Sequence, residues 1–177
     1  MNEFLRWLAL NTIVGNSDAY GGLSAHNYYL YGSPRHRDRL FWIPWDHDLS
    51  MSTGGLGGGP IGGGTPGGNV DVFHAGITAS WPLIRFFMDD PVYRATYRAH
   101  VENLLGTVFE PSSLSARLQS EHARIAPFVI GASGELPGRS FAGTPAQFDA
   151  TVFGPTGLIA YVESRAAAVR RALGAAQ

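Results

Sequence analysis

The sequence predicts an α+β fold in which a small β-hairpin carries the polar residues of interest and a helical bundle follows it. Two aromatic, apolar segments at 27–31 and 40–43 have the composition of strands. The stretch 32–39 between them contains Gly and Pro and is typical of a hairpin loop. After residue 81 apolar side chains recur mostly at the spacing of helices.

Length and composition indicate one domain that spans residues 1–177. Hydrophobic residues make up 45% of the chain, which is enough for a packed core. The net charge of -1 gives no global attraction to nucleic acid or to an anionic membrane. No apolar run approaches the ~18 residues of a membrane span. The absence of cysteine excludes disulfides and thiolate metal sites.

Helices are predicted from apolar periodicity and from their end signals. Residues 3–14 form the first, and Gly15 suits its C-terminal stop. Asp90 is a candidate N-cap for a helix predicted over 91–105, and Pro91 suits the first position of that helix. Pro127 predicts a kink or stop near the end of a later helix. The other predicted helices cover 82–88, 91–105, 113–129 and 156–173, the last closed by Gly174.

The remaining segments are predicted as connections. Residues 16–25 form a loop with Gly21 and Gly22 as turn material, and 131–143 form another. The stretch 53–69 is a Gly-rich insert of low complexity that cannot contribute to a core. Two interpretations remain open for this insert: a mobile lip over the site or a tolerated insertion. Aromatic residues of the strands are expected in the sheet core or in cross-strand pairs: Tyr28, Tyr29, Tyr31, Phe41, Trp42 and Trp45.

Oxygen-bearing side chains lie at the edges of the predicted strands. Asp18 follows the first helix, Asn27 begins the first strand, and Asp46 and Asp48 follow the second. In extended chain Asp46 and Asp48 point to one face about 7 Å apart, where two carboxylates repel unless a cation lies near them. His47 would then point the other way, into packing. Since Mg²⁺ prefers oxygen ligands, these residues are expected to converge on a Mg²⁺ or Mn²⁺ site.

Each of these residues also has a purely structural interpretation. Asp18 could cap a turn through its own side chain, and Asn27 could bond the backbone where a strand begins. One of Asp46 and Asp48 could face solvent while the other caps the following turn. Arg35, Arg37 and Arg39 are expected at the hairpin tip, where they either steer an acidic protein or are simply solvated.

The sequences of three segments around these residues resemble the CotH family of atypical protein kinases, named for a bacterial spore coat protein. The segments are NSDAY at 16–20, HNYYLY at 26–31 and IPWDHDLS at 43–50. Later segments look like the same family: WPLIR at 81–85, DPVYR at 90–94 and YVESR at 161–165. Their order also fits, because kinases place a catalytic Asp before a metal-binding Asn and a second metal-binding Asp.

The resemblance implies a kinase-like C-lobe and a chemistry for each residue. Asp18 would be the catalytic carboxylate that orients the attacking hydroxyl, and Asn27 and Asp46, with Asp48 near, would hold Mg²⁺ against the phosphates of ATP. The family enzyme would phosphorylate Ser on a coat or surface protein. The implied location is the spore coat, the cell surface or the extracellular space.

The nucleotide-covering N-lobe is expected to be absent from this chain. Only 17 residues precede Asp18, and they read as one helix. All 13 basic residues are Arg, so no Lys is present to hold the α- and β-phosphates. Whether the polypeptide is an enzyme by itself therefore stays open. The alternatives are a non-catalytic coat or surface module and a metal-dependent hydrolase that uses the same carboxylates.

Overall fold

The computed structural model describes residues 1–22, 25–51, 71–132, 134–135 and 144–175. The Gly-rich insert predicted at 53–69 lies outside the described residues, as does much of the loop predicted at 131–143. The elements follow in the order α1 (Asn2–Val14), β1 (Tyr28–Ser33), a 3₁₀ turn (Pro34–His36), β2 (Arg39–Pro44), α2 (Pro82–Asp89), α3 (Pro91–Gly106), α4 (Pro111–Val129), α5 (Pro145–Phe153) and α6 (Leu158–Ala175).

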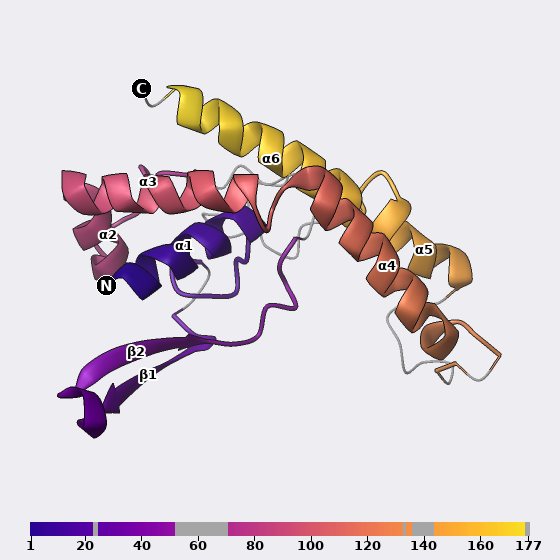
Figure 1. Ribbon diagram of the computed structural model, residues 1–177, viewed down its shortest axis with the longest axis horizontal. Helices are drawn as coiled ribbons and strands as arrows, with labels where there is room; N and C mark the ends of the chain where they lie inside the picture. The colour runs from indigo at the N-terminus through magenta and orange to yellow at the C-terminus, as the bar shows by residue number, and fades with distance from the viewer. Residues whose placement is uncertain (23–24, 52–70, 133, 136–143, 176–177) are drawn as a thin grey trace.

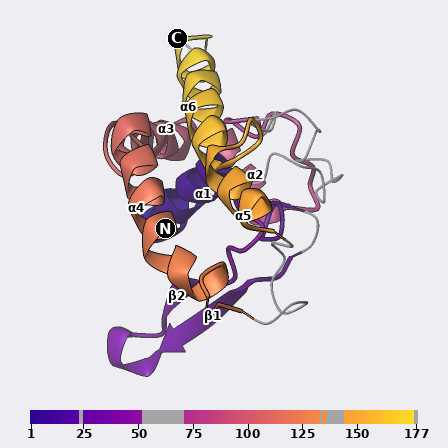
Figure 2. The ribbon, with the colours of Figure 1, turned by 90° about the vertical axis from the view of Figure 1, so that its right-hand side faces the viewer.

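The architecture is mixed α+β, with a small antiparallel hairpin and several helices (Figure 1). Helix α1 packs along α3, and α6 contacts both of them. Helices α4 and α5 pack on the other part of α6. In both views the hairpin extends from one side of the helical body (Figure 1, Figure 2). No helix among the described residues is long and apolar enough to cross a membrane.

The hydrophobic core lies between α1, α2, α3 and α6. One face of α1 supplies Leu5, Leu8 and Ile13, which are almost fully buried. Ile84 and Phe87 of α2 pack into the same cluster. The contributions of α3 and α6 complete it: Tyr97, Val101, Leu104, Leu105, Tyr161, Val162, Ala166, Val169 and Leu173. The beginning of the chain is therefore fixed between helices that come much later in the sequence.

The hairpin is anchored to this core through one aromatic pair. Tyr28 of β1 stacks on Trp42 of β2 with ring centroids 4.1 Å apart, and Trp42 packs against Phe4 and Trp7 of α1. The other predicted cross-strand pairs also form, but toward solvent. Tyr29 stacks on Trp45 at 6.1 Å and Tyr31 lies 6.5 Å from Phe41. Only the inner face of the hairpin is therefore part of the core.

Several helix ends agree with their sequence signals. Gly15 ends α1 in the left-handed region with φ 63°. Asp90 accepts hydrogen bonds from the N–H groups of Val92 and Tyr93, as predicted for the α3 cap. Pro127 lies inside the last turn of α4, which ends at Val129. Helix α6 continues through Gly174 to Ala175, so this glycine does not close it.

Helix α5 was not among the predicted elements, although its start carries a clear signal. Thr144 accepts a hydrogen bond from the N–H of Gln147, and Pro145 occupies the first helical position. The helix is short, and a nine-residue segment offers too few turns for apolar periodicity to stand out. It lies against α4, where Phe148 stacks on His122.

The C-terminal end of α1 is held by a buried arginine. Arg165 of α6 is 1% exposed and donates to the carbonyl oxygens of Thr12 and Ile13 at 2.7 and 3.3 Å. Tyr161 donates its hydroxyl to the same Ile13 oxygen at 3.0 Å. These carbonyls have no partner within the helix, and a cation beside them also favours the helix dipole. Burial lowers the pKa of Arg165 from its ordinary value.

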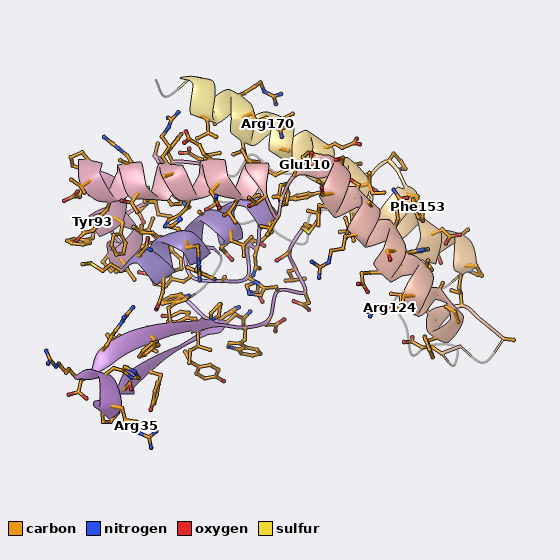
Figure 3. All side chains as sticks on the ribbon, viewed as in Figure 1. Arg35, Tyr93, Glu110, Arg124, Phe153 and Arg170 are labelled. Carbon is orange, nitrogen blue, oxygen red and sulfur yellow. The ribbon has the colours of Figure 1, made fainter. Side chains whose placement is uncertain are left out.

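We expect Arg165→Met to lower the free energy of unfolding by about 3 kcal/mol, because buried charge-assisted bonds to two carbonyls are lost. Arg170→Met is the matched control, since Arg170 lies exposed on the same helix (Figure 3). Urea unfolding followed by circular dichroism measures both. Equal stability of the two variants would contradict the anchoring role of Arg165.

A second buried polar group lies beside α1. His74 has φ 53° and is 7% exposed. Its Nε2 lies 3.0 Å from the Thr12 hydroxyl oxygen, and that hydroxyl donates to Leu8 O at 2.8 Å. The hydroxyl proton is thus committed, so His74 donates through Nε2–H. Burial lowers the pKa of His74 to about 4; Asp71 opposes this shift and Arg165 adds to it.

His74 should make stability fall as pH decreases. The unfolded chain binds a proton here near the ordinary pKa of 6.5, whereas the folded protein binds it only near 4. The contribution of His74 to the free energy of unfolding is therefore fully present above pH 6.5. It is lost as the pH falls from 6.5 to 4, by up to about 3 kcal/mol. His74→Asn tolerates the left-handed backbone and should remove this part of the pH dependence. Melting temperatures of both proteins across this range provide the test, and parallel curves would contradict it.

Candidate functional site

Asp18 lies in the loop that follows α1. Its backbone N–H donates to the Asn16 side-chain oxygen at 3.0 Å, which fixes the turn locally. The carboxylate contacts two side chains. One oxygen pairs with His26 Nε2, and the other accepts from Asn27 Nδ2 at 2.9 Å. The Asp18 side chain is still 23% exposed, so its carboxylate is accessible to solvent.

Asn27 is oriented by Asp18 rather than by the strand that it precedes. It is 7% exposed and has φ 59°, so the backbone is left-handed rather than extended. Its Nδ2 donates to both the backbone oxygen and the carboxylate of Asp18, at 2.7 and 2.9 Å. Because both amide hydrogens of Asn27 are used, its side-chain oxygen Oδ1 is the atom that could bind a cation.

Asp46 and Asp48 do not lie on an extended strand as predicted. Strand β2 ends at Pro44, and Asp46 has φ 52°. Asn and Asp tolerate this region better than most residues, which suits a sharp departure from the strand. The two carboxyl groups nevertheless meet. A hydrogen bond with Asp46 is the largest cause that raises the pKa of Asp48, followed by desolvation, and the Asp18 charge adds to the shift.

The segments that carry these residues are hydrogen-bonded to one another. Trp45 N–H donates to Asn27 O at 3.1 Å, which joins the residue after β2 to the residue before β1. Asn16 Nδ2 lies 3.1 Å from His47 Nδ1 and 3.5 Å from Asp46 O. His47 is exposed, so the expectation that its ring points into packing is wrong. Asp18, Asn27, Asp46 and Asp48 therefore share one small region.

The side-chain oxygens of this region are of the kind that hard cations bind in proteins. They belong to Asp46 and Asp48, whose interaction raises the pKa of Asp48, to Asp18, whose charge adds to that shift, and to the Asn27 side chain that contacts Asp18. The pKa of Asp48 is raised chiefly by Asp46, and a cation beside the two carboxyl groups would oppose the repulsion between them. In the described part of the chain, no group of three or more His, Cys, Asp and Glu side chains is arranged to hold a metal ion.

Sequence reasoning missed Asn16 as a member of this region. Asn16 is 4% exposed and uses its side-chain oxygen for Asp18 and its amide group for the segment after β2. The pattern Asn-x-Asp, typical of a side chain that caps a turn two residues later, was a signal for the first contact. The contact with residue 47 depends on the tertiary structure and left no local signal.

Comparisons with known proteins identify the family of this chain. The model of the family described as CotH kinase protein matches residues 1–169. The chain is 27% identical to the inner spore coat protein H of Bacillus subtilis (strain 168) over 138 residues, which are 73% of this chain and 32% of that protein. The chain thus spans about a third of the length of this relative. No solved structure matches it.

The family match covers both halves of the candidate site, the α1 anchor, and the helices up to most of α6. It therefore does not depend on one short segment, and the resemblance found in the sequence is confirmed. This chain belongs to the CotH kinase protein family.

Proposed function

We propose that this chain is the kinase-like C-lobe of a protein kinase that transfers the γ-phosphoryl group of ATP to a Ser hydroxyl of a coat or surface protein. The observation that carries the proposal is the contact between Asp18 and Asn27 with the Asp46–Asp48 pair beside them. Phosphoryl transfer needs a carboxylate near the nucleophile and oxygen ligands for the cation that binds the phosphates. Residues of both kinds lie on segments that are hydrogen-bonded to one another, which supports the proposal.

Asp18 is suited to orient the attacking hydroxyl and accept its proton. Asn27 donates to one carboxylate oxygen, and His26 pairs with the other, so the group is fixed before a substrate arrives. Asn27, Asp46 and Asp48 would hold Mg²⁺ or Mn²⁺. The bound cation would neutralise charge that develops on the phosphate oxygens. His47 is not needed as a ligand, because hard cations prefer oxygen.

A second candidate function is a non-catalytic coat module, and the composition favours it. The chain contains no lysine, so a phosphate-binding lysine must come from outside these 177 residues. The relative is named for the inner spore coat, which supports a location in the spore coat under either function. The two candidates differ in whether nucleotide and metal bind.

The first test is stabilisation by metal. Mn²⁺ that binds only the folded protein should raise its stability by ~2.7 kcal/mol at a hundredfold excess over the dissociation constant. Asp46→Asn should lose most of this gain. Asp38→Asn at the hairpin tip is the matched control, since Asp38 is exposed and also has positive φ. A parent melting curve that is unmoved by millimolar Mn²⁺ or Mg²⁺ would refute the cation site.

The same variants test the charge repulsion without metal. The folded pKa of Asp48 is raised, so the contribution of the pair to stability is present at acidic pH and lost as pH rises through the folded value. In chelator at pH 7, Asp46→Asn should therefore be at least as stable as the parent. At pH 3 this advantage should disappear. Melting curves at both pH values measure it, and a less stable Asp46→Asn in both buffers would mean that the pair is structural.

Catalysis is best tested in a longer polypeptide. The isolated chain should transfer little phosphate from ATP, because it has no lysine. A chimera of the Bacillus subtilis relative, in which the region aligned with this chain is replaced by the aligned part of this chain, supplies the remaining sequence. Labelled ATP should phosphorylate protein in this chimera and not in its Asp18→Asn form. If the unmodified relative transfers phosphate and the chimera does not, the coat module is favoured. If the chain binds metal with an affinity that nucleotide does not change, a hydrolase is favoured.

A further inference from the structure

Asn16 connects the two carboxylate-bearing segments of the site through one side chain. It precedes Asp18 by two residues and is separated from Asp46 by thirty. At 4% exposure it is one of the most buried polar residues of the chain. Burial of an amide is unfavourable unless its donors and acceptor form hydrogen bonds, so the hydrogen bonds of Asn16 show which segments its side chain connects.

The directions of the Asn16 bonds are determined by the groups around it. The backbone N–H of Asp18 can only donate, so it fixes the Asn16 oxygen as the acceptor at 3.0 Å. The amide nitrogen must then face the segment after β2. It donates to the Nδ1 atom of His47 at 3.1 Å and approaches Asp46 O at 3.5 Å. His47 is consequently the tautomer that carries its hydrogen on Nε2.

The backbone of Asn16 is anchored independently of its side chain. Its N–H donates to Asn11 O at 3.2 Å, and its carbonyl oxygen accepts from Asn11 Nδ2 at 3.3 Å. Asn11 belongs to α1, whose end is fixed by Arg165. The Asn16 side chain is thus a rigid bridge from the helical body to the segment of Asp46 and Asp48.

We propose that Asn16 is a positioning residue, which sets the separation between Asp18 and the Asp46–Asp48 pair and thereby the cation affinity of the site. This inference rests on the proposed function for its metal-binding consequence. Asn16 is not one of the proposed ligands, because its side-chain oxygen accepts from Asp18 N–H and its amide nitrogen faces His47 and Asp46. Replacing a residue that is hydrogen-bonded to metal ligands and orients them typically lowers metal affinity by about 10- to 100-fold.

The test compares Asn16 with Asn11, a buried asparagine whose side chain donates to Asn16 O rather than to the segment of Asp46. Asn11→Ala keeps the bond from Asn16 N–H to the Asn11 backbone oxygen, so the Asn16 side chain stays in place. We expect Asn16→Ala to weaken Mn²⁺ binding, measured by electron paramagnetic resonance, by about tenfold or more. Asn11→Ala should weaken it by less than about threefold even if it destabilises the protein equally. Equal affinities of the two variants would overturn the positioning role.

Asn16→Asp separates the two halves of the bridge. It keeps an acceptor for the Asp18 N–H but loses the donors that face His47 and Asp46. Its added negative charge would by itself strengthen cation binding, so weaker Mn²⁺ binding can only come from lost positioning. This variant also serves if Asn16→Ala fails to fold. An affinity equal to or above that of the parent would count against the proposal.

Amide hydrogen exchange in chelator tests the bridge without any metal. Asn16→Asp should leave the Asp18 amide protected while exchange of the Trp45 amide becomes at least tenfold faster, although Asn16 does not touch that amide. Unchanged exchange at Trp45 would overturn the coupling itself. A parent that shows this coupling but binds no Mn²⁺ would instead refute the proposed cation site and leave Asn16 as a bridge between the two segments.

Discussion

The arrangement of this protein depends on a positive charge buried against the end of a helix. Arg165 comes from the last helix, yet its guanidinium satisfies carbonyls at the end of the first one. Charged groups are rarely buried this fully without compensation, and here the compensation is a set of carbonyl oxygens that otherwise lack partners. Tyr161 adds a second donor one turn earlier on the same helix. The Asp18 loop begins where this anchor ends, so the site takes its position from the C-terminal part of the chain.

Close backbone contacts keep the Asp18 loop compact. A Cβ at Gly15 would lie 2.5 Å from the Tyr161 hydroxyl, in a backbone region that already favours glycine. A Cβ at Gly22 would lie 1.9 Å from the carbonyl oxygen of Ser17. A side chain is therefore excluded at Gly15, before Asp18, and at Gly22, after it. Met51 N–H closes the region from the other direction with a bond to Val14 O at 2.7 Å.

Local signals predicted the parts of the fold that are decided locally. The Asp90 cap, the Gly15 stop and the strand pair each depend on a few neighbouring residues, and each was recovered from the sequence. The proximity of Asp18, Asn27 and the two later aspartates followed from their place beside strands and loops.

What the sequence could not supply was backbone detail and long-range bonding. Asn27 and Asp46 adopt left-handed backbones because their segments are tied to other segments, and no periodicity reports that. Asn16 shows the same limit, since its contact with His47 spans thirty-one residues. The solvent-facing aromatic pairs of the hairpin, such as Tyr29 with Trp45, could not be separated by composition from the buried pair Tyr28 with Trp42.

The two-stranded sheet has a consequence for how copies of this protein behave at high concentration. Within the described residues β1 and β2 pair only with each other, so each strand keeps one outer edge whose backbone groups can pair with another strand. The turn between them carries Arg35 and Arg37, and Figure 3 shows Arg35 at the far end of the hairpin; Arg39, the first residue of β2, pairs instead with Glu3 of α1. Like charges at the tip oppose side-by-side association of two hairpins. Solubility should therefore depend on ionic strength, because salt screens this repulsion between arginines.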